Sequence, residues 1–169
     1  KARMDVVELG GEMDYRQLYL REARLYHTPL SAEADAALDQ AFERLTGGAE
    51  LDPVTLEVQG RRLEVPRAAK GVARFSFNEL CGQPLGPADY LAIEAAFHTV
   101  ILDGVPQMTP ALRNEAKRFV TLIDVLYEHR VHTIIAADAA PSDLYLEGTG
   151  AFEFARTASR LVEMQSEDY

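Results

Sequence analysis

Apolar residues along the chain recur with two periods, one helical and one extended, and segments of the two kinds alternate. Apolar positions three and four residues apart predict amphipathic helices. Four segments carry this spacing: 31–45, 87–97, 109–130 and 152–164. Two apolar runs without polar alternation, 100–103 and 131–137, predict strands that are covered on both faces.

The first fifty residues predict a short strand, a connection and one well-bounded helix. The strand is 6–9, and a polar, Arg-rich connection follows over 15–26. Ser31 suits the N-cap of the first helix, and Gly47 suits its C-terminal end.

A β-hairpin is predicted around a two-residue turn at 59–60, which is Gln-Gly. This turn places Leu56 opposite Leu63 on one face and Glu57 opposite Arg62 on the other, a favourable cross-strand pair. Downstream of the hairpin, apolar residues at every second position over 73–77 predict a third, half-buried strand.

The longest helix is predicted to begin at Thr109-Pro110 and to lie between the two buried strands. Strand, helix and strand in this order predict a right-handed parallel βαβ unit. The residues expected to face the sheet are Leu112, Phe119, Ile123 and Leu126, and those expected inward on the last helix are Phe154, Ala158, Leu161 and Val162. The fold class is therefore α/β: a mixed sheet with a parallel βαβ unit, a β-hairpin and flanking helices.

Composition and charge narrow the function classes. In 169 residues, 17 Lys and Arg face 27 Asp and Glu, so the net charge is −10. A field of this sign repels polyanions, which argues against nonspecific nucleic-acid binding. No apolar run reaches the length of a membrane span. The single cysteine, Cys81, forms no internal disulfide and fits a reducing compartment.

Acidic residues follow both buried strands. The run from Val100 to Asp103 resembles a Walker B strand, whose aspartate holds Mg²⁺, but Gly104 stands where hydrolysing enzymes often carry a glutamate. Asp138 follows the second strand at the same edge of the sheet. Asp103 is therefore a candidate metal ligand, alone or with Asp138. The simpler interpretation is that Asp103 ends its strand and caps the loop over 105–109, and that Asp138 is a solvated loop acid. A GxxxxGK[ST] phosphate loop is absent from all 169 residues.

Basic residues concentrate in one segment, 61–74, and recur one turn apart on two helices. In that segment Arg67 and Lys70 are candidates for binding phosphate, although a solvated hairpin face also explains them. Like charges four residues apart, as at Arg156 and Arg160 and again at Arg113 and Lys117, repel each other unless an anion lies nearby. For the last helix that anion is either an external phosphate or the helix's own glutamates, 153 and 163.

Several segments in fixed order resemble one family. They are 67–77, Leu80 to Gly86, 97–106, Arg113 to Phe119 and Ser159 to Ser166. Together they resemble the carboxy-terminal half of the ZapE-type cell-division ATPases, a branch of the AFG-like family that includes the lactation-elevated proteins. The resemblance covers almost the whole chain.

This resemblance implies a P-loop, AAA-like parent that hydrolyses ATP with Mg²⁺, is cytoplasmic and acts with an FtsZ-like division protein. The phosphate loop would lie in an amino-terminal half, so the chain is expected to be a fragment that is inactive alone and carries no bound cofactor. Residues 1–50 would then be the end of an ATPase core strand plus a helical connector, and 51–169 a carboxy-terminal α/β domain. Arg156 and Arg160 become candidate finger arginines that reach a neighbouring subunit of a homo-oligomer.

Two other functions stay open. The basic hairpin suits a partner-binding module that docks an acidic protein such as an FtsZ-like filament. The acids after the buried strands suit a free-standing enzyme in which Asp103 and Asp138 hold a metal.

Overall fold

A five-stranded mixed sheet forms the centre of the protein, as the computed structural model of residues 15–166 and 169 shows. The strand order is β1-β7-β6-β5-β4. Strands β5, β6, β7 and β1 are paired in parallel, and β4 pairs antiparallel with β5. Their bounds are β1 Tyr26–His27, β4 Ala68–Ala69, β5 Val72–Ser76, β6 Thr99–Val105 and β7 His132–Ala137. The predicted α/β fold with a mixed sheet is confirmed.

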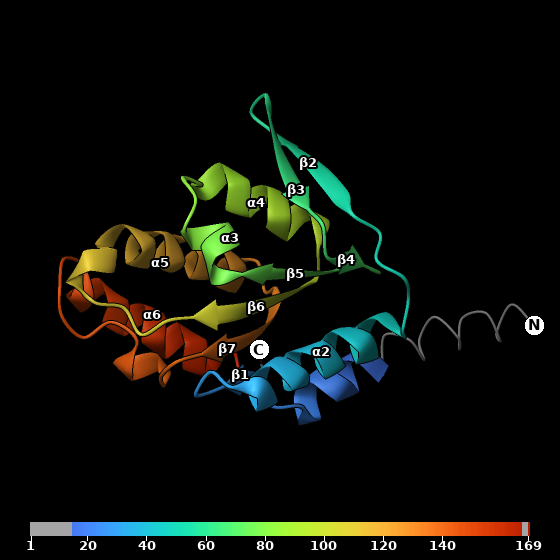
Figure 1. The fold of residues 1–169 in the computed structure, drawn as a ribbon, viewed down its shortest axis with the longest axis horizontal. Helices are drawn as coiled ribbons and strands as arrows, with labels where there is room; N and C mark the ends of the chain where they lie inside the picture. The colour runs from blue at the N-terminus through green and yellow to red at the C-terminus, as the bar shows by residue number, and fades with distance from the viewer. Residues whose placement is uncertain (1–14, 167–168) are drawn as a thin grey trace, which may run out of the picture.

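Helices cover both faces of this sheet. One face carries α2 (Ala32–Thr46), and the other carries α3 (Phe77–Cys81), α4 (Pro87–Ala96), α5 (Arg113–Glu128) and α6 (Ala151–Glu163). Figure 1 shows α4 above the strands and α2 below them. Alternate residues of the central strands supply the two cores: Ile101 and Ile134 pack with α2, whereas Leu102 and Ile135 belong to the larger core under α5.

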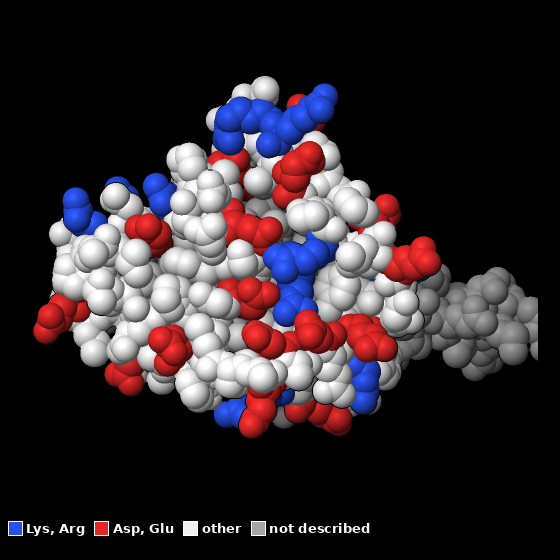
Figure 2. Space-filling view, viewed as in Figure 1, with Lys and Arg blue, Asp and Glu red and all other residues white. Residues whose placement is uncertain are grey.

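The hairpin is a separate sheet of β2 (Val54–Val58) and β3 (Arg61–Val65), and it projects beyond the main sheet in Figure 1. Its register is the predicted one, with Leu56 opposite Leu63 and Glu57 opposite Arg62. The turn residues before Arg61 have positive φ, as the Gln-Gly turn requires. Figure 2 shows basic side chains gathered at the tip of this hairpin.

The cap prediction for α2 is confirmed. The Ser31 side chain accepts a hydrogen bond from the backbone N–H of Ala34 at 3.1 Å. Gly47, at φ 66°, ends the helix in the left-handed conformation that glycine adopts without strain.

The parallel βαβ unit is also confirmed. β6 and β7 are adjacent and parallel, and α5 connects them across one face. On α5, the side chains of Phe119, Ile123 and Leu126 are fully buried, as predicted. Leu112 is only half-buried, because Thr109 and the residues after it form a 3-10 turn, Pro110–Leu112, before α5 begins.

Three boundaries or faces differ from the sequence-based expectations. β6 continues past Asp103 to Val105 through a register shift, where Gly104 has φ 72°. Phe77 begins α3 instead of ending β5, because Ser76 caps that helix. Val162 is 60% exposed, since it lies at the solvent edge of the α6 stripe rather than inside it.

The amino-terminal part is helical where a polar connection was expected. Residues 15–22 form a helix, and its buried Leu20 packs in the core under α2. The predicted strand 6–9 lies outside the described residues, and the domain boundary at 50/51 stays a prediction. In the described part of the chain, no helix has the length and apolarity that a membrane span requires.

Candidate functional site

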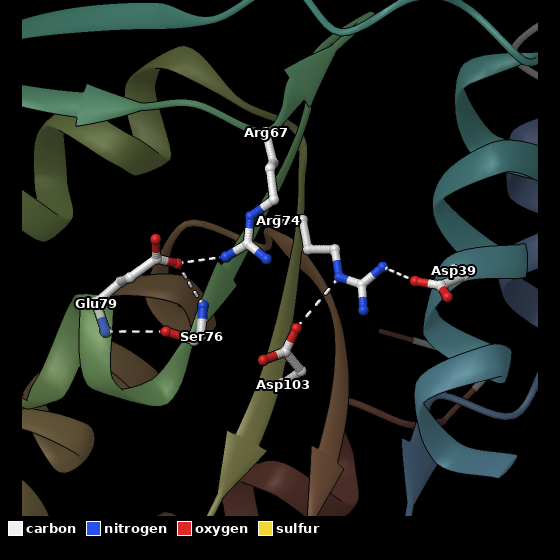
Figure 3. A network of polar contacts seen from close by, with 6 residues as sticks. All are labelled: Asp39, Arg67, Arg74, Ser76, Glu79 and Asp103. Carbon is white, nitrogen blue, oxygen red and sulfur yellow. Dashed lines mark hydrogen bonds and ion pairs between the residues drawn. The ribbon is translucent and has the colours of Figure 1, made fainter. Parts of the chain in front are cut away.

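The carboxyl ends of β5 and β6 carry a polar cluster, shown in Figure 3. The Nε of Arg74 donates to Oδ2 of Asp103 at 3.2 Å, and its Nη1 contacts Asp39 of α2. Arg74 is 14% exposed and Asp103 is 19% exposed. Arg74 comes two residues after Val72, and Asp103 two residues after Ile101, so both side chains lie on the α2 face of the sheet. The polar cluster therefore covers one end of the core beneath α2.

A second contact in the same view joins Arg67 to α3. Ser76 and Glu79 form a capping box, in which the Ser76 N–H donates to Oε1 of Glu79 at 2.8 Å and the Glu79 N–H donates to Oγ of Ser76 at 3.1 Å. The Arg67 guanidinium binds the same Glu79 oxygen. Its charge is therefore used to fix the start of α3.

The acids after the buried strands are not brought together as a metal site. Asp103 faces Arg74, and the exposed Asp138 uses its backbone N–H to donate to the carbonyl of Val105 at 2.8 Å. Within residues 15–166 and 169, no group of three His, Cys, Asp or Glu side chains has metal-binding geometry. A cation at Asp103 would have to displace the guanidinium of Arg74. The role of Asp103 as a metal ligand stays a prediction.

Lys70 and Arg67 were predicted together as candidates for binding phosphate, but they do not face the same site. It occupies the turn between β4 and β5 with φ 52°, and its carbonyl is 3.1 Å from Nε2 of His98. Lys70 lines a cavity of about 310 Å³ with Arg16, Arg44 and His98, whereas Arg67 points to α3. Burial lowers the pKa of His98.

The two arginines of α6 have different environments. Arg160 is 21% exposed and binds α5: its Nη1 is 2.5 Å from Oδ1 of Asp124, its Nη2 is 3.6 Å from Glu128, and it stacks over the Tyr127 ring at 4.7 Å. Arg156 is exposed, and no described carboxylate lies within 4.0 Å of its guanidinium. Of these two arginines, Arg156 is the one that is available to an external anion.

The partners of these arginines were missed in the sequence. The glutamate at 163 was expected near Arg160, but it accepts a hydrogen bond from the Tyr127 hydroxyl at 2.9 Å. Asp124 and Glu128 replace it, and their acidic i, i+4 spacing on α5 was a signal that matched the basic spacing on α6. Asp39 had no such signal, because it lies 35 residues before Arg74 on a helix of the opposite layer.

Comparison with known proteins assigns the family. The whole chain, residues 1–169, matches the model of the AFG1-like ATPases. It is 37% identical over 169 residues to the cell division protein ZapE of Escherichia coli K12, covering 100% of this chain and 45% of that protein. It is also 34% identical over 199 residues to the lactation elevated protein 1 homolog B of Danio rerio, covering 97% of this chain and 40% of that protein.

No solved structure matches the chain. The chain spans less than half the length of these curated relatives. The order of segments 67–77, 97–106 and 159–166 that indicated the resemblance is thus supported by a match along the full sequence. The chain belongs to the AFG1-like ATPase family.

Proposed function

We propose that this chain is the carboxy-terminal portion of an ATP-hydrolysing, AAA-like protein that acts in cell division. The observation that carries the proposal is the match of all 169 residues to the AFG1-like ATPase model, combined with coverage of 45% of ZapE. ATP and Mg²⁺ would be bound by the amino-terminal ATPase half of the longer protein, because the 169 residues contain no phosphate loop. A cytoplasmic location belongs to the same proposal.

In this role the chain supplies contact surfaces rather than the chemistry of phosphoryl transfer. Arg160 fixes α6 on α5 through Asp124, and this packing holds the preceding turn of α6 in place. Arg156, one turn earlier and exposed, is the better placed of the two candidate finger arginines. In a homo-oligomer it would stabilise the charge that develops on a neighbour's nucleotide, an effect worth about 10³–10⁵ in rate when such a finger is complete.

An assay of phosphate release by the isolated chain with Mg-ATP tests the proposal. No phosphate release is expected, because the 169 residues contain no phosphate loop that would hold the β- and γ-phosphates for transfer. Turnover of ATP by the chain alone would contradict it. In the longer protein, Arg156→Ala should lower kcat with little change in KM for ATP, and the exposed Arg21→Ala is the matched control.

The second candidate function is docking of an acidic partner, such as an FtsZ-like filament, by the hairpin. The gathering of basic side chains at its tip in Figure 2 favours this function. Arg61 is already paired with the buried Asp89 at 3.0 Å, whereas Arg62 is 77% exposed and only 4.0 Å from Glu57. Arg62→Glu should therefore abolish co-sedimentation with such a filament; unchanged co-sedimentation would remove this candidate.

A further inference from the structure

Three basic side chains line one cavity of about 550 Å³ between α5 and α6. Arg113 and Lys117 reach it from successive turns of α5, and Arg156 reaches it from the first half of α6. A cavity of this size falls within the range of small-molecule sites, about 300–1,000 Å³. In a chain of net charge −10, three cations on one cavity wall are a marked local reversal of sign.

These three side chains form no ion pair with any described residue. Arg61, Arg67, Arg74 and Arg160 each have a carboxylate partner within 4.0 Å. Among the described residues, no carboxylate lies within that distance of the cations in this cavity. No ion pair with a described residue therefore offsets the repulsion between Arg113 and Lys117 along α5, and an anion placed between them would relieve it.

The remaining lining adds neutral hydrogen-bonding groups and the start of a helix. Asn114, Thr121 and Thr149 contribute polar side chains to the wall, and Gly150 caps α6 in the left-handed conformation. The Ala151 N–H already donates to the Gly148 carbonyl at 3.1 Å, but the macrodipole of α6 still adds positive potential at its start to that of the side chains.

One acid, Glu153, also lines the cavity. It occupies the third position of α6, and its Oε2 lies 3.8 Å from the position that a Cβ on Gly150 would take. This carboxylate therefore lies near the start of its own helix and in the wall of the cavity. It should compete with that anion rather than assist it.

We propose that the cavity lined by Arg113, Lys117 and Arg156 is a binding site for a phosphate chain, in the form of pyrophosphate or the polyphosphate of a nucleotide. Guanidinium groups bind phosphate oxygens through paired N–H donors, and a lysine adds a compact charge. A chain of two or three phosphates offers several oxygens to cations that come from two helices, whereas a single carboxylate offers two. The inference rests on the proposed function only for the origin of the phosphate; the binding itself requires no ATP hydrolysis.

Titration of the ¹⁵N-labelled chain with pyrophosphate, without Mg²⁺ and at about 0.15 M ionic strength, tests the site, since surface charges farther apart than about 8 Å are screened there. Backbone amide signals of Phe152 and Glu153 should shift in a saturable way. Arg156→Gln should weaken binding about tenfold, equivalent to about 1.4 kcal/mol. Glu153→Gln should tighten it, whereas Arg62→Gln, which removes one charge from the hairpin, should leave it unchanged.

Parallel titrations separate the sources of the ligand. ATP binding with pyrophosphate-like affinity identifies the phosphate chain as the recognised group, and adenosine should not bind. Failure to saturate, or equal weakening by Arg156→Gln and Arg62→Gln, would overturn the site. Binding of a hexaglutamate peptide without binding of pyrophosphate would also overturn it and assign the surface to an acidic protein. None of these outcomes depends on turnover by the longer protein, so this site and the proposed function can fail separately.

Discussion

Replacement of Phe119 by alanine is the sharpest test of how the helices pack on the sheet. Phe119 is fully buried in the middle of α5. Its ring centroid lies 5.9 Å from that of Phe154 in α6 and 6.1 Å from that of Phe77 in α3. One side chain therefore joins three helices that are distant in the sequence.

The expected loss follows from the volume that would be emptied. Phenylalanine-to-alanine changes in cores cost about 3–5 kcal/mol, and this site should lie in the upper part of that range because α3, α6 and the sheet hold the cavity open. Domains of this size are stable by about 5–15 kcal/mol, so the variant should remain folded but be close to its limit.

Urea unfolding followed by far-ultraviolet circular dichroism measures the loss. The urea concentration at the midpoint of unfolding should fall. The slope of the unfolding free energy against urea concentration should stay constant, because the surface exposed on unfolding is unchanged. Phe152→Ala is the matched control: Phe152 is 91% exposed, and its removal should change stability by less than about 0.5 kcal/mol. A loss below about 1 kcal/mol for Phe119→Ala would refute the assigned packing.

Three further predictions concern polar groups. Arg74→Ala should lower the free energy of unfolding in urea by about 1–3 kcal/mol, because it leaves the half-buried Asp103 carboxylate without its partner. A loss under about 0.5 kcal/mol, as at exposed sites, would contradict this role. Burial raises the pKa of Cys81, so a thiol reagent at about pH 8 should label the native chain far more slowly than the urea-unfolded chain, and equal rates would show the thiol to be accessible. Burial lowers the pKa of His98 and of His132, so the unfolded state binds more protons below about pH 6.5, and stability should fall from pH 7.5 to about pH 5.5. That slope should be smaller in His132→Gln, and an identical slope would contradict the assignment.

Most of the fold could be predicted because its signals are local. The turn at 59–60 and the alternation around it determined the hairpin register, and Ser31 and Gly47 marked the ends of α2. Apolar runs identified β6 and β7 as covered strands. The face of α6 was harder, because Val162 is adjacent to the buried Leu161 and only the width of the packing partner decides which residue lies at the edge.

The site was less predictable because its contacts join distant segments. Pairing of Arg74 with Asp39 requires α2 to lie over β5, and no local pattern states this. The basic cavity combines α5 with α6; the spacing of Arg113 and Lys117 was visible, but its coincidence with Arg156 needed the packing of the two helices. Sequence reasoning could name the charges and could not assign their partners.

The measurement that tests the central claim most directly is ATP turnover by the longer protein with and without residues 51–169. If this region supplies contacts that an AFG1-like ATPase needs, its deletion should strongly lower the turnover while the remaining half still binds Mg-ATP. The isolated chain, assayed with ATP in the absence of the amino-terminal half, should release no phosphate. Full turnover by the deleted protein would contradict a role for this chain in ATP hydrolysis.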